Sequence, residues 1–123
     1  MEWNFKNGIP LYTQIITEMT MRIASGLYGP GERLPSVRDL AMDAGVNPNT
    51  MQRALAELER KGLVFSARTN GRYVTEEEIV LKSLHEELAR QYFDEFIEKL
   101  CKIGLTDDKI CDAVHRWLAE AKK

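Results

Sequence analysis

Residues Leu34 to Lys61 read LPSVRDLAMDAGVNPNTMQRALAELERK, and this stretch predicts two short helices joined by a tight turn. Ser36 precedes Asp39 by three residues, so the hydroxyl and the carboxylate can each satisfy a free amide at a helix start. We therefore expect the first helix to begin at about Ser36. Gly45 tolerates the left-handed conformation that ends such a helix, which leaves a turn of about three or four residues.

The second helix has a start signal of its own in Asn47 and Pro48. An asparagine side chain caps free amides, and proline at the first helical position loses no hydrogen bond. Helical spacing then separates an apolar side from a polar one. The inward set is Met51, Ala54, Leu55 and Leu58, and the outward set is Asn49, Gln52, Arg53, Ala56 and Arg60. One face is expected to pack, and the other is presented to solvent.

This layout is typical of a DNA-binding helix-turn-helix, whose second helix enters the major groove. Helix pairs with solvated Arg, Gln and Asn are also common in small α-helical domains, so the layout alone leaves both interpretations open. The next residues favour DNA binding. Residues 63–67 predict a strand, Asn70-Gly71 a hairpin turn and residues 72–74 a returning strand. A helix-turn-helix followed by a hairpin predicts a winged helix.

The predicted hairpin, residues 63–74, carries Arg68 and Arg72 beside a glycine at its tip. Guanidinium groups placed there can reach phosphates or the minor groove. Charged side chains also protect exposed sheet edges without any binding role. Because the hairpin directly follows the helix at about residues 48–61, we favour contact with DNA.

The rest of the chain predicts three further helices. Residues 10–25 form one that packs on the helix-turn-helix, residues 76–100 a long amphipathic one, and a last helix follows Thr106. Two C-terminal helices cannot bury so wide an apolar stripe, so we expect a second copy of the chain to cover it. The expected dimerisation residues are Leu81, Leu84, Leu88, Tyr92, Phe96, Leu100, Val114 and Trp117.

The prediction is thus a mainly α fold with a small β-hairpin wing. A winged helix-turn-helix domain over residues 1–75 precedes a helical dimerisation tail over residues 76–123. The formal net charge of −2 argues at first sight against DNA binding. However, residues 1–75 carry nine Lys and Arg against seven Asp and Glu, whereas residues 76–123 carry eight against twelve. Affinity would then rest on a few placed contacts, doubled in a dimer.

Catalysis and metal binding have little support in the sequence. His85 and His115 fall on amphipathic helices, and Cys101 and Cys111 have no ligand partners at zinc spacing. No phosphate loop or nucleophile motif is present. We expect a protein that is not an enzyme and needs no cofactor or metal. No apolar run approaches about 18 residues and no secretory leader is evident, so we expect no membrane span and a cytoplasmic location.

Several spaced motifs, in order, carry a family resemblance. They are IPLYxQI from Ile9, GxxxPGExLPSxRxLA from Gly26, VNPNT from Val46 and GLV from Gly62. The run they cover, residues 9–74, resembles the GntR family of bacterial transcriptional regulators, and VNPNT with the short tail resembles its YtrA-type subfamily. The resemblance implies that its targets include its own or a neighbouring operon, often one with a transporter. Together with the expected dimer, we predict a homodimeric regulator, most simply a repressor, that binds a palindromic operator.

The expected DNA-binding residues follow from both lines of reasoning. Asn49, Gln52 and Arg53 are placed to read bases, because Asn and Gln pair with adenine and Arg with guanine. Ser36 and Thr50 suit phosphates. The resemblance implies Arg38 and Gly71 as contacts, and Asn47, Arg68 and Arg72 complete the set. The chain departs from many family members at Pro48, Gln52 and Thr69, so a guanine-centred readout is not assumed.

Two other interpretations stay open at this point. A winged helix can hold another protein with the same face, which the acidic overall charge permits. A ligand or metal sensor could use His115 or the cysteines, and an unidentified small-molecule effector would bind at a junction between domains or subunits.

Overall fold

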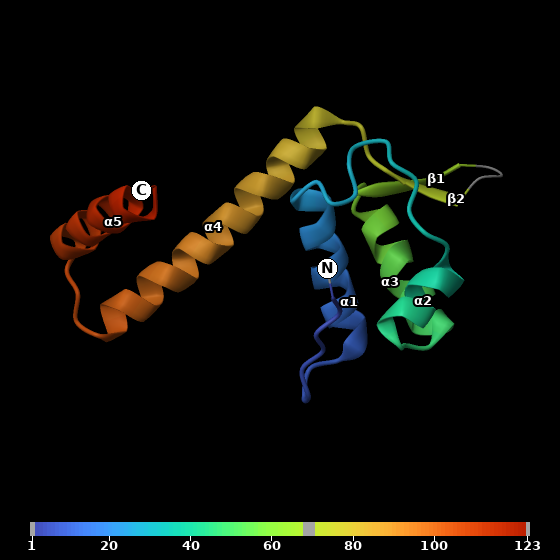
Figure 1. The fold of residues 1–123 in the computed structure, drawn as a ribbon, viewed down its shortest axis with the longest axis horizontal. Coiled ribbons are helices and arrows are strands. Elements are labelled where there is room, and N and C mark those ends of the chain that lie inside the picture. The colour runs from blue at the N-terminus through green and yellow to red at the C-terminus, as the bar shows by residue number, and fades with distance from the viewer. Residues whose placement is uncertain (1, 68–70, 123) are drawn as a thin grey trace. The chain divides into compact units, whose positions relative to one another are not determined.

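The computed structural model of the chain describes residues 2–67 and 71–122 (Figure 1). Arg68, Thr69 and Asn70, which include one predicted DNA-binding arginine and half of the predicted hairpin turn, lie outside the described residues. The elements are α1 (Leu11–Ala24), α2 (Val37–Ala44), α3 (Pro48–Arg60), β1 (Val64–Ala67), β2 (Gly71–Val74), α4 (Glu78–Lys102) and α5 (Asp107–Ala121). They form two compact units, one up to His85 and one from Glu86 onward.

The helix-turn-helix begins and ends where its capping residues predict. The Ser36 hydroxyl accepts a hydrogen bond from the amide of Asp39 at 3.0 Å, and Gly45 ends α2 with a φ of 70°. At the start of α3, the Asn47 side chain accepts from the amide of Asn49 at 2.7 Å. Both caps satisfy amides that would otherwise lack a partner. The predicted helix-turn-helix is confirmed.

The core of the first unit lies where α1, α2 and α3 meet. Figure 1 shows α1 beside α3, with α2 against α3 and the hairpin at the C-terminal end of α3. All four residues predicted to face inward from the second helix are buried. The buried set includes Ile15, Met19 and Ile23 of α1, Leu40 and Ala41 of α2, and Met51, Ala54, Leu55 and Leu58 of α3. This core fixes which side of α3 is left to solvent.

The hairpin is wider than the sequence predicted. β1 and β2 pair antiparallel, with Val64 opposite Val74 and Ser66 opposite Arg72. The segment before α2 adds to the free edge of β2, because the amide of Leu34 donates to the Arg72 carbonyl at 2.8 Å and Arg33 forms a bridge with Tyr73. The segment before α2 is therefore part of the sheet. It ties the start of the helix-turn-helix to the wing.

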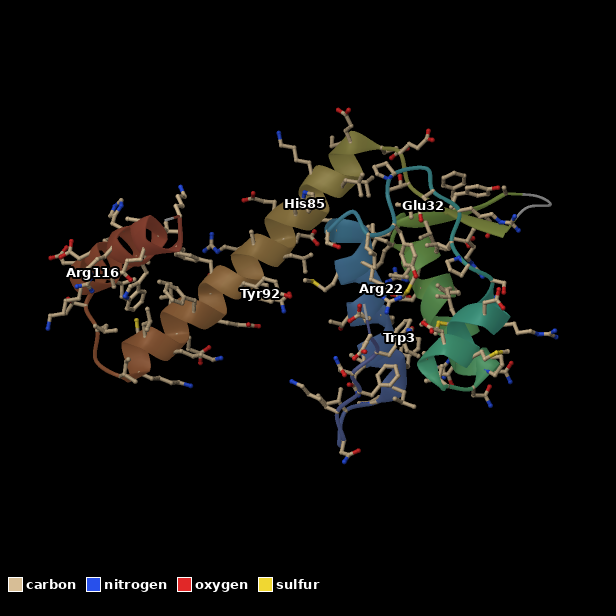
Figure 2. All side chains as sticks on the ribbon, in the orientation of Figure 1. Trp3, Arg22, Glu32, His85, Tyr92 and Arg116 are labelled. Carbon is tan, nitrogen blue, oxygen red and sulfur yellow. The ribbon has the colours of Figure 1, made fainter. Side chains whose placement is uncertain are left out.

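The N-terminal arm docks onto its own unit. The Trp3 indole N–H donates to Asp43 of α2 at 2.9 Å, and the guanidinium carbon of buried Arg22 lies 4.2 Å from the centre of the Trp3 ring (Figure 2). Burial would lower the pKa of Arg22, but hydrogen bonds with Glu18 and Tyr28 raise it above its ordinary value. The arm therefore joins α1 to α2 around a charged cation.

Three of the eight residues expected in a dimer interface are exposed aromatic side chains of the second unit. Tyr92, Phe96 and Trp117 are 46 %, 38 % and 49 % exposed, while Ile110 and Ala113 of α5 are buried. Leu88, Leu100 and Val114 of this unit are half-buried, as is Leu81 of the first unit.

Leu84 corrects the predicted set, because it is only 8 % exposed and belongs to the first unit. The next residue, His85, places its Nε2 2.6 Å from the Ala24 carbonyl, so this turn of α4 lies against the end of α1. Leu84 packs within its own chain, and a partner does not need to cover it.

Candidate nucleic-acid interface

The exposed face of α3 carries the residues predicted to read bases. Asn49, Gln52 and Arg53 are all exposed, and Gln52 and Arg53 follow Asn49 by three and four residues, so they share its side of the helix. The four buried residues of α3 occupy the opposite side. Hydrogen-bond donors on the N-terminal half of an exposed helix are what base edges in the major groove require.

Two residues predicted to contact DNA also act as helix caps. The side chains of Ser36 and Asn47 each accept from a backbone amide as helix caps. Thr50 is half-buried beside the Asn47 cap, and Arg38 is exposed in the first turn of α2. The starts of both helices therefore present backbone amides, a hydroxyl and a guanidinium, which are groups that bind phosphate.

The wing arginine is engaged with α3. The Arg72 Nε donates to Glu59 Oε1 at 3.3 Å, and the Ser66 hydroxyl donates to the same oxygen at 2.7 Å. On α3 itself, Arg60 pairs with Glu57 through two guanidinium nitrogens. The Arg60 hydrogen bond lowers the pKa of Glu57, and Glu57 raises the pKa of Arg60. Both arginines thus meet carboxylates of α3.

A shallow hollow of about 390 Å³ lies between α3 and the hairpin. Its lining residues are Ala56, Glu59, Arg60, Ser66 and Arg72. Ala56 and Arg60 continue the exposed face that begins with Asn49, because both positions follow it at helical spacing. The candidate DNA-reading face therefore extends along α3 to the hairpin without interruption.

Two residues of this surface were missed from the sequence. Arg33 is exposed, and its Nε would lie 3.5 Å from a Cβ added to Gly71, so its side chain lies beside a predicted contact at the turn end of the wing. Glu59 is the second missed residue, because it accepts hydrogen bonds from Ser66 and Arg72 of the hairpin, which are distant in sequence. The only sequence signal for Arg33 was its position between Gly31 and buried Leu34.

Other kinds of site find no residues to support them in the described part of the chain. Among residues 2–67 and 71–122, no group of three or more His, Cys, Asp or Glu could hold a metal ion. The helices described there are all too short or too polar to cross a bilayer. Cys101 and Cys111 are free and exposed.

The fold and this surface define a winged helix-turn-helix DNA-binding protein. The chain belongs to the GntR family, because the profile described as "Bacterial regulatory proteins, gntR family" matches residues 11–74. It is a transcriptional regulator rather than an enzyme.

Relatives and solved structures agree with this assignment. The chain is 32 % identical to the uncharacterized HTH-type transcriptional regulator YhcF of Bacillus subtilis, over 93 % of this chain and 94 % of YhcF. It is 42 % identical to the HTH-type transcriptional repressor YtrA of the same organism, over 58 % of this chain and 55 % of YtrA. The predicted resemblance to GntR regulators of YtrA type is confirmed.

Two solved structures are similar in fold. A GntR family transcriptional regulator from Listeria monocytogenes has a TM-score of 0.83 and 37 % identity, covering 91 % of this chain and 98 % of the other. The DNA-binding domain of AraR, solved in complex with operator ORX1, has a TM-score of 0.56 and 26 % identity, covering 61 % of this chain and 96 % of that domain.

Proposed function

We propose that this regulator is a cytoplasmic homodimer that represses transcription by binding a palindromic operator. The observation that carries the proposal is the exposed face of α3, where Asn49, Gln52 and Arg53 follow a capped helix start and lead toward the hairpin. In this proposal α3 enters the major groove, and the starts of α2 and α3 hold phosphates. The operator complex of the AraR domain and the repressor name of YtrA support it.

The proposed dimer rests on the second unit. Tyr92, Phe96 and Trp117 expose much of their rings, and small folded units rarely leave so many aromatic side chains in water. A second copy would bury these rings and place two copies of α3 for two half-sites. We accordingly assign DNA binding to residues 1–75 and dimerisation to residues 76–123, with Leu84 left out of the interface.

The direct test is a binding titration with the DNA upstream of the protein's own gene. Fluorescence anisotropy of that duplex should show saturable binding, with tighter binding than to a shuffled duplex of equal length and composition. Log affinity should fall linearly with log salt concentration, with a slope of about −0.9 for each phosphate contacted. A solution mass measured by light scattering should equal two subunits.

Three results would contradict parts of this proposal. Equal affinity for the upstream and shuffled duplexes would exclude an operator upstream of the protein's own gene. Neighbouring promoters would then be tested. Absence of binding to any duplex would favour a protein-interaction role for the same face. Activation of a reporter gene, in place of lower expression, would overturn the repressor assignment. Repeating the titration with added small molecules tests for an effector.

A further inference from the structure

The two arginines beside the hollow between α3 and the hairpin each contact a carboxylate of α3. Arg60 pairs with Glu57 one helical turn earlier, and Arg72 reaches Glu59 across the hollow. The Arg60 pair is a local contact within one helix. The Arg72 pair joins two elements, so it can set the position of the wing relative to the helix.

Glu59 holds both strands of the hairpin through a single oxygen. Ser66 and Arg72 lie directly opposite each other in the sheet, and both donate to Glu59 Oε1. The Arg72 side chain is 18 % exposed and the Glu59 side chain 39 % exposed, so the pair is partly shielded from water. The sheet fixes the position of β2, so the hydrogen bond to Glu59 holds the Arg72 side chain against α3.

The hollow is open, and two of its lining side chains can bind a phosphate group. Its volume is about 390 Å³, and the small Ala56 side chain leaves the approach from α3 open. An anion there would meet the Ser66 hydroxyl and the Arg72 guanidinium, which bind phosphate well. It would also meet the Glu59 carboxylate, which repels it. An anion therefore competes with Glu59 for Arg72.

We propose that Glu59 is a positioning residue for Arg72, and that Arg72 exchanges Glu59 for a backbone phosphate of DNA at this hollow. This inference rests on the proposed DNA binding and assigns a role within it. In the free protein Glu59 keeps the guanidinium beside α3. On DNA, part of the attraction between Arg72 and phosphate is offset by the loss of this pair. Glu59 thus lowers affinity for duplex DNA of any sequence, because phosphate contacts carry no sequence information.

A double-mutant cycle on a labelled duplex of arbitrary sequence tests the exchange. The proteins are wild type, Glu59→Gln, Arg72→Gln and the double variant, each full length. Glu59→Gln preserves side-chain shape and should tighten binding about two- to five-fold, the range of a partly exposed ion pair. Arg72→Gln should weaken binding and make the salt slope shallower by about 0.9. In the double variant the gain from Glu59→Gln should disappear.

Glu98→Gln is the matched control, because it removes the same charge from an exposed pair with Lys102 in the second unit. Its affinity should equal that of wild type. Additive effects in the cycle would show that Glu59 only repels DNA, and this would overturn the exchange. Weaker binding by Glu59→Gln, or an unchanged salt slope in Arg72→Gln, would also overturn it. If the wild-type protein binds no duplex, the proposed function itself is overturned. If wild type binds DNA and the Glu59→Gln variant has the same affinity, only this inference is overturned.

Discussion

The guanidinium carbon of Arg53 lies 4.8 Å from the ring centre of Tyr12, so a side chain of α1 supports one on the exposed face of α3. A cation over an aromatic ring is restrained in its rotamers and stabilised by the ring electrons. An arginine held in this way loses less entropy when it binds a base. The packing of α1 on α3 therefore contributes to the candidate DNA-reading face as well as to the core.

Tyr12→Leu should weaken operator binding about two- to five-fold, which corresponds to the cation–π energy at an exposed site. The measurement is a titration of the best-bound duplex with each variant. Tyr12→Phe keeps the ring and should bind like wild type. If the Phe variant loses as much affinity as the Leu variant, the tyrosine hydroxyl matters and the ring does not.

Arg38→Ala and Gln52→Ala should separate affinity from sequence preference. Arg38 is exposed in the first turn of α2, so its loss should weaken binding to all duplexes and make the salt slope shallower by about 0.9. Gln52 faces outward from α3, and its loss should reduce discrimination at one base pair by about 1–3 kcal/mol. Selection from a randomised duplex pool measures both effects.

Gln91→Ala provides the control for Gln52→Ala, because it removes an exposed glutamine from α4. It should leave affinity and preference unchanged. A uniform loss of affinity in Gln52→Ala, with the same preferred sequence, would assign Gln52 to the phosphates. An unchanged affinity in Arg38→Ala would remove that residue from the interface.

Local signals were sufficient to predict the helix-turn-helix. Ser36, Gly45 and Asn47 act within a few residues of their own positions, and the apolar spacing of α3 needs only helical geometry. The side of α3 that faces solvent therefore follows from the sequence alone.

Contacts between distant segments could not be predicted in this way. Three features depend on residues that no short-range pattern relates. They are the bridge between Arg33 and Tyr73, the contact of Glu59 with Arg72, and the burial of Leu84. Leu84 repeats the apolar spacing of the residues around it on α4, so periodicity gave it the same role as Leu88. Only the packing of this helical turn near the end of α1 distinguishes the two leucines.

Asn47 should act on DNA binding through helix capping. Its side chain accepts from the Asn49 amide, so Asn47→Ala should lower the free energy of unfolding by about 0.5–2 kcal/mol, measured by urea titration. Asn47→Ser restores a capping oxygen and should recover most of that stability together with operator affinity. Stability recovered without affinity in the Ser variant would instead indicate a direct contact between Asn47 and DNA.

The exposed rings of the second unit should be required for dimerisation. Replacing Tyr92, Phe96 and Trp117 together with serine removes the aromatic surface that we assign to the interface, and light scattering should then give the mass of one subunit. Operator affinity should fall about 100-fold or more, because two half-sites are no longer bound at once. Leu27→Ser, at a residue 48 % exposed in the first unit and outside residues 76–123, is the control and should remain dimeric. A triple variant that keeps the mass of two subunits would place the interface elsewhere in the chain.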